Sequence, residues 1–139
     1  MIIADTGAMI ALIDRKDPQH RTVVATYEAH ADDWILPWAI LPEVDYLLGA
    51  HVGAAAQDAF LADLAEAAYA VDWGSEQDLD DAWRITRQYK TLRLGLVDAV
   101  VMAVAARHRA RAIATLDLRH FGAVKISGNP QLWPRDLRG

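Results

Sequence analysis

Apolar and polar residues follow patterns that predict strands and helices in alternation. Between short apolar runs, apolar residues recur every three or four positions, which is typical of helices that bury one face. Strands that alternate with helices indicate an α/β fold with a mostly parallel sheet covered on both faces, which binds ligands at the carboxyl ends of its strands. The apolar runs that predict strands lie at residues 1–4, 34–36, 68–73, 112–116 and 123–127.

Two of the predicted helices have distinctive patterns. Ser75 and Asp78 have the spacing of a capping box, so a helix should begin there and reach about Leu92. Residues 96–106 are apolar nearly all round apart from Asp98, which indicates a helix buried at the centre of the fold. The buried stripe of the first of these helices is expected to consist of Leu79, Ala82, Trp83 and Tyr89.

Composition narrows the classes of function. A chain of 139 residues that is 53% hydrophobic and 24% charged is expected to form one domain over residues 1–139. It has no cysteine, which excludes disulfides, thiolate zinc sites and cysteine nucleophiles, so a metal ion would need oxygen or imidazole ligands. No apolar run is long enough to cross a membrane and the start lacks a secretion-signal pattern, so a cytoplasmic protein without membrane contact is expected.

Charge is unevenly distributed along the chain. A net charge of −5 by itself argues against a nucleic-acid partner. Residues 1–83, however, hold 3 basic and 16 acidic side chains, a balance of −13, whereas residues 84–139 hold 11 basic and 3 acidic ones, a balance of +8. This uneven distribution has two possible explanations, which are ordinary helix-dipole complementarity and a surface that binds a phosphate backbone. The basic residues that extend the positive surface towards Asp98 are Arg84, Arg87, Lys90 and Arg93.

Four carboxylates are expected at the carboxyl edge of the sheet. Asp5 and Asp117 each follow an apolar strand, and Asp98 and Glu43 lie in the first turns of helices. Converging carboxylates repel one another unless a cation is bound, and the hard ions Mg²⁺ and Mn²⁺ take oxygen ligands. Such a metal can activate water and neutralise charge on a phosphodiester, which indicates phosphodiester hydrolysis. Each acid alone also has an ordinary role open to it, as a helix cap, a turn residue or a first-turn charge.

The segments around these acids resemble the PIN-domain nucleases, and most closely the VapC-type toxins of bacterial toxin–antitoxin pairs. The resemblance spans nearly the whole chain and implies a metal-dependent endoribonuclease on a three-layer α/β/α, Rossmann-like fold. Any one motif is weak evidence, whereas four in this order are fairly specific. The motifs are Ile3-Ala4-Asp5-Thr6, Leu41-Pro42-Glu43-Val44, Leu96-Val97-Asp98-Ala99, and Thr115-Leu116-Asp117 with His120-Phe121.

The resemblance also implies which residues form the site. Pro42 departs from the family pattern and bears on the orientation of Glu43, while Asp45 would face about 200° around the helix and is set aside as a substitute. The implied ligands of Mg²⁺ or Mn²⁺ are Asp5, Glu43, Asp98 and Asp117, with the hydroxyl residues Thr6 and Thr115 beside them.

Two aromatic side chains near these motifs are expected to have structural roles. His120 invites assignment as a general base, but a water activated by a metal needs no histidine. Packing beside Phe121 or bonding to the backbone is therefore the favoured role of His120. Trp38 lies near Glu43 in the sequence and could stack on a base, although burial under the sheet is the favoured interpretation.

The function that the resemblance implies is that of a toxin which cuts single-stranded or loop RNA (tRNA, rRNA or mRNA) and so inhibits translation. It further implies a cognate antitoxin that covers the acidic cleft, and a homodimer. A non-catalytic RNA- or protein-binding module on the same fold is the main alternative. A phosphoryl-transfer domain of the receiver or haloacid type is disfavoured, because Asp5-Thr6-Gly7 has no second aspartate two residues on and Asp117 stands where a receiver would have lysine.

Overall fold

The computed structural model describes residues 1–137, so the last two positions of the predicted domain lie outside the described residues. Its centre is a five-stranded sheet in the order β3-β2-β1-β4-β5, and all four strand pairings are parallel. The expected parallel α/β sheet is confirmed. The strands are β1 (Ile2–Ala4), β2 (Trp34–Pro37), β3 (Ala70–Asp72), β4 (Ala112–Ala114) and β5 (Gln131–Trp133).

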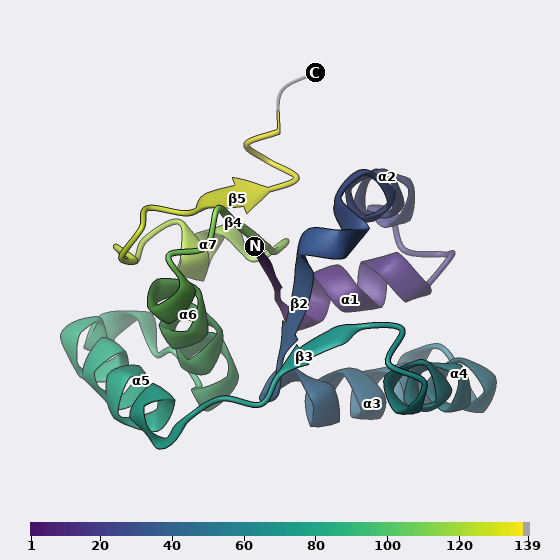
Figure 1. Ribbon diagram of the computed structural model, residues 1–139, viewed down its shortest axis with the longest axis horizontal. Coiled ribbons are helices and arrows are strands. Elements are labelled where there is room, and N and C mark those ends of the chain that lie inside the picture. Colours follow the sequence, from purple (N-terminus) through teal and green to yellow (C-terminus); the bar gives the residue numbers. More distant parts are fainter. Residues whose placement is uncertain (138–139) are drawn as a thin grey trace.

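Helices cover both faces of this sheet, which gives the three layers (Figure 1). On one side lie α1 (Thr6–Ile13), α2 (His20–His30), α3 (Ile40–His51) and α4 (Ala54–Ala65). On the other side lie α5 (Glu76–Gln88) and α6 (Leu96–His108). Short elements complete the described chain: α7 (Leu118–Phe121) and two 3-10 helices, Ala31–Asp33 and Lys90–Leu92.

Helix α6 has the central position that its apolar sequence predicts. All residues from Ala99 to Ala105 are buried, and the helix packs on both β1 and β2. Within residues 1–137, every helix is too short or too polar to span a lipid bilayer.

Strand order reverses at β1, and this reversal creates the edge where the acids gather. The chain runs from β1 outward to β2 and β3, then crosses back to β4 and β5 on the other side of β1. Strands β1 and β4 are therefore parallel neighbours, with Ala4 opposite Ala114, and the N–H of Asp5 donates to the carbonyl of Ala114 at 2.9 Å. Residues that directly follow these two strands must lie side by side at a topological switch point.

The prediction of a last strand at residues 123–127 is wrong. That segment is irregular and only buries Val124 and, in part, Ile126 against the core. The chain then turns at Gly128 and Asn129, both of which have positive φ, before β5 pairs with β4. Non-local pairing with β4 selects Gln131–Trp133 as the strand, because its Leu132 and Trp133 are each only 4% exposed.

The predicted buried stripe of α5 is also partly wrong. Ala82 is buried and Tyr89 packs against the core, but Leu79 and Trp83 are 49% and 57% exposed. The Trp83 ring carries the guanidinium of Arg87 above it, 4.7 Å from the ring centroid. The buried side of α5 instead follows Asp78, Ala82, Ile85 and Tyr89.

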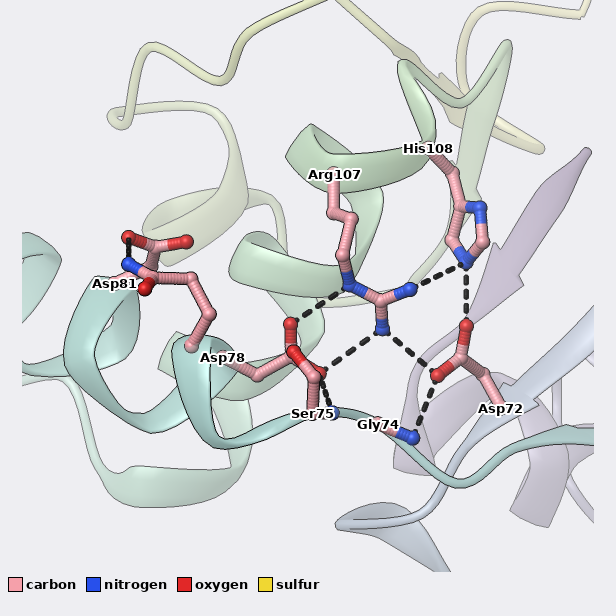
Figure 2. A network of polar contacts seen from close by, with 8 residues as sticks. Asp72, Gly74, Ser75, Asp78, Asp81, Arg107 and His108 are labelled. Carbon is pink, nitrogen blue, oxygen red and sulfur yellow. Dashed lines mark hydrogen bonds and ion pairs between the residues drawn. The ribbon is translucent and has the colours of Figure 1, made fainter.

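Asp78 can lie in the interior because an arginine of α6 neutralises it (Figure 2). The Nε and Nη2 groups of Arg107 donate to the two carboxylate oxygens of Asp78 at 2.8 and 2.9 Å, and Nη2 also donates to Asp72 at 2.8 Å. His108 bonds to the other oxygen of Asp72. The N–H of Ser75 donates to Asp78 at 3.0 Å, which confirms the capping box. One guanidinium therefore ties β3, α5 and α6 together.

Replacing Arg107 with methionine should lower the free energy of unfolding by about 3 kcal/mol, because the fully buried Asp78 carboxylate would lose its cation. Urea unfolding of the two proteins measures the difference. The matched control is Arg84→Met, whose partner Asp80 is exposed, and which should cost less than about 1 kcal/mol. Equal losses in the two variants would contradict a structural role for the buried pair.

Candidate functional site

Asp5 lies where β1 ends and α1 begins, and it is 5% exposed. Its Oδ1 accepts a hydrogen bond from the N–H of Thr6 at 2.8 Å, and its Oδ2 accepts one from the hydroxyl of Thr115 at 2.8 Å. Burial raises the pKa of Asp5 to about 7, and the charges of Asp98 and Asp117 act in the same direction. The ionised form of Asp5 is therefore unfavourable by itself, and a nearby cation would stabilise it.

Thr115 connects the ends of the two central strands. Its hydroxyl donates to Asp5, and the same oxygen accepts the backbone N–H of Asp117 at 3.0 Å. Thr115 is 1% exposed, so this geometry is held by the surrounding core. Thr115 thus fixes the carboxylate of Asp5 relative to the backbone of Asp117.

Asp117 and His120 form a compact pair at the start of α7. Oδ1 of Asp117 accepts the backbone N–H of His120 at 3.1 Å, and Oδ2 lies 2.9 Å from Nδ1 of the same histidine. The favoured role of His120, packing beside Phe121 or bonding to the backbone, is therefore wrong for its ring, because Nδ1 faces a carboxylate. The three-residue spacing is the signal in the sequence, since residues i and i+3 share a helix face.

Asp98 approaches the same imidazole from α6. It lies in the first turn of that helix, and its Oδ2 is 3.3 Å from Nδ1 of His120. Partial burial raises the pKa of Asp98, the charges of Asp117 and Glu43 raise it further, and His120 opposes the increase. Repulsion between these carboxylates remains unfavourable until a cation joins them.

These side chains form a donor set that suits a divalent metal ion. One ligand atom from each of Asp98, Asp117 and His120 lies within 4.8 Å of the other two. Carboxylate oxygens suit Mg²⁺ and Mn²⁺, and imidazole suits transition metals. Asp5 lies next to this group through Thr115 and through its charge coupling with Asp98 and Asp117. The acidic cluster could therefore bind a metal ion.

Glu43 lies at the margin of the cluster. It is exposed in the first turn of α3, and its link to the other acids is the effect of its charge on Asp98. Pro42 fits at this point because the first turn of a helix leaves its N–H groups unpaired anyway. Asp45 is directed elsewhere, since its carboxylate accepts a hydrogen bond from Gln57 of α4 at 3.2 Å.

Thr6 and Trp38 complete the residues that the sequence singled out. Thr6 is buried beside Asp5, and its hydroxyl oxygen has no hydrogen-bond partner among residues 1–137. An unpaired buried hydroxyl next to a carboxylate leaves one polar contact available to a ligand of the site. Trp38 is half-buried and packs against the core, as the favoured interpretation expected.

Replacing His120 with glutamine should weaken Mn²⁺ binding about tenfold or more, because the imidazole would be lost while the backbone cap of α7 remains. Calorimetric titration with MnCl₂ measures the affinity. His51→Gln, at the end of α3 and exposed, serves as the control and should bind like the unmodified protein. Unchanged affinity in His120→Gln would remove the histidine from the donor set.

Comparison with known proteins shows the family of this chain. Residues 2–126 match the family model for the PIN domain. Ribonuclease VapC26 of Mycobacterium tuberculosis is 35% identical over 127 residues, which cover 91% of this chain and 94% of that protein.

Solved structures share the fold. VapC20 of M. tuberculosis, described as a sarcin-ricin loop cleaving toxin, superimposes with a TM-score of 0.82 at 20% identity over 92% of this chain and 98% of that one. DNA-bound VapBC from Salmonella typhimurium gives a TM-score of 0.70 at 17% identity over 94% and 95% of the two chains. The chain therefore belongs to the PIN-domain family, and within it to the VapC ribonucleases.

Proposed function

We propose that this protein is a divalent-metal-dependent endoribonuclease, the toxin of a type II toxin–antitoxin pair, which inhibits translation by cutting single-stranded or loop RNA. The observation that carries the proposal is the meeting of Asp98, Asp117 and His120 within 4.8 Å, next to the buried Asp5. Charges arranged in this way are costly in a metal-free protein and favourable around a cation. Membership of the VapC ribonucleases supports RNA as the polymer that is cut.

Each side chain has a separate task in this proposal. Asp98, Asp117 and His120 would hold Mg²⁺ or Mn²⁺, with Asp5 as a further carboxylate of the metal site. A bound ion of this kind supplies an activated water and neutralises charge on the phosphodiester. Thr115 keeps Asp5 and Asp117 in register.

Glu43 is assigned to a second ion or to the orientation of the attacking water. Its exposed carboxylate can accept a proton from a water molecule that approaches the site from solvent, because it lies outside the tight cluster. Thr6 is assigned as a polar contact of the site through its unpaired hydroxyl.

A cognate antitoxin is the protein partner that the proposal requires. The structural similarity to the toxin–antitoxin complex VapBC supports such a partner. The proposal also includes a homodimer, and a place in the cytoplasm, where tRNA, rRNA and mRNA are accessible to a toxin that acts on translation.

Sequencing of RNA ends after induced expression tests the activity and its target together. The unmodified protein should arrest growth and create new RNA ends at a restricted set of sites, whereas Asp5→Ala should create none. Loss of the Asp5 carboxylate removes a charge coupled to both Asp98 and Asp117, which explains the expected effect. No growth defect and no new ends would instead favour a non-catalytic RNA- or protein-binding module on the same fold.

A further inference from the structure

A cavity of about 360 Å³ is lined by Thr115, which bonds to Asp5, and by Leu116 and Leu118, which flank Asp117 in the chain. Four separate segments form its walls: the start of α2, the end of β4, α7 and the segment that follows β5. The residues that line it are Gln19, Thr115, Leu116, Leu118, Pro134 and Arg135.

Thr115 connects this cavity to the acids. It lines the cavity, and its hydroxyl is bonded both to the carboxylate of Asp5 and to the backbone of Asp117. The cavity and the acids therefore share Thr115, so the cavity is a candidate surface for the nucleotide next to one whose phosphate lies at the acids.

The walls of the cavity have the chemistry of a base-binding pocket. Leu116, Leu118 and Pro134 supply apolar surface for the faces of a planar ring. At the rim, the guanidinium of Arg135 is held by Asp136 through two hydrogen bonds of 2.7 and 3.0 Å, which fixes its planar group.

Gln19 supplies the polar specificity of the pocket. Its side chain makes no capping hydrogen bond at the start of α2 and has no other hydrogen-bond partner among residues 1–137. A carboxamide offers a donor and an acceptor next to each other, which matches the paired groups on the edge of a base. Gln19 is exposed at the edge of the cavity, so its carboxamide is free to turn towards the polar edge of a bound base.

We infer that this cavity binds one unpaired nucleobase of the RNA, next to the scissile phosphate, and that Gln19 reads the edge of that base. The inference rests on the proposed ribonuclease function and adds to it a determinant of cleavage sequence. It requires a base preference at one fixed position beside each cut.

Cleavage of a randomised single-stranded RNA library in MnCl₂, followed by sequencing of the ends, tests this inference. Gln19→Ala should reduce the preference at that position about tenfold, because the edge contacts are lost while the walls remain. Leu118→Ala should slow cleavage of all sequences several-fold, because the base loses a contact face. The exposed residues Gln88 and Leu61 provide the controls Gln88→Ala and Leu61→Ala, which should leave rate and preference unchanged.

Two further measurements separate this inference from the wider proposal. Calorimetric titration with MnCl₂ should give the same affinity for Gln19→Ala and Leu118→Ala as for the unmodified protein, which shows that the acid cluster is intact. A labelled RNA that lacks the base at the preferred position should bind the unmodified protein about tenfold more weakly than the complete RNA.

Cleavage that shows no preference at the flanking position, or the same preference in Gln19→Ala, would overturn the base pocket and leave the ribonuclease function standing. If RNA binds without being cut, equal binding of the complete and the base-lacking RNA would overturn it. A protein that neither cuts nor binds RNA would overturn both the pocket and the proposed function.

Discussion

Replacing Asp98 with asparagine should reduce RNA cleavage about a thousandfold while the protein stays folded. Asparagine keeps the volume of the side chain but removes one of the two carboxylates that lie within 4.8 Å of each other and of His120. The metal-free variant should also be more stable than the unmodified protein. The reason is that burial, together with the charges of Asp117 and Glu43, raises the pKa of Asp98, so that its ionised form is unfavourable without a cation.

Cleavage of a labelled RNA in Mn²⁺ and urea unfolding in a chelator measure these two effects on the same samples. Asp58→Asn is the matched control, because Asp58 is exposed on α4 and should change neither result. Loss of activity accompanied by loss of stability would indicate a damaged fold. Full activity in Asp98→Asn would contradict the assignment of this carboxylate to the metal site.

The second large effect concerns Asp5 and pH. In the folded, metal-free protein burial raises the pKa of Asp5 from 3.8 to about 7, so the folded state retains a proton that the unfolded chain has already released. Stability contributed by this group is fully present below about pH 4 and is lost as the pH rises through about 7. The total loss corresponds to about 4 kcal/mol, since each pKa unit is worth about 1.4 kcal/mol.

Urea unfolding of the unmodified protein and Asp5→Asn across this pH range isolates the contribution of Asp5. Asparagine can still accept the N–H of Thr6 and contact Thr115, so the variant should gain stability relative to the unmodified protein as the pH rises. Saturating Mn²⁺ at pH 7 should remove most of the difference in the free energy of unfolding between the two proteins, because the ion stabilises the ionised aspartate. If the free energies of unfolding of the two proteins change with pH in parallel in the chelator, Asp5 does not carry the unfavourable charge.

The sequence is sufficient to predict the edge of the sheet where the acids gather. Apolar strands that end in Asp5 and Asp117, within alternating strands and helices, require both residues to lie at the carboxyl edge of one parallel sheet. Asp98 could be placed there because an isolated charge in the first turn of a buried helix needs compensation. These are consequences of local pattern and chain direction alone.

Where the structure differs from the predictions made from the sequence, the cause is contact between segments that are distant in the sequence. The position of β5 depends on its pairing with β4, and this pairing lies outside the local pattern of apolar residues. The orientation of α5 depends on Arg107, which makes a buried position at Asp78 favourable and leaves Trp83 exposed. His120 faces Asp117 through its local three-residue spacing, but it lies 3.3 Å from Asp98 only because α6 and α7 are brought together by the fold.

In the proposed function, the acid cluster uses a divalent ion to cut RNA. The most direct test is the rate at which the purified protein cuts an unstructured RNA, first in a chelator and then during titration with MnCl₂ or MgCl₂. We expect no cleavage in the chelator, and activity that rises with the concentration of the ion until the site is saturated. The same rate of cleavage in the chelator, or no cleavage with either ion, would contradict it.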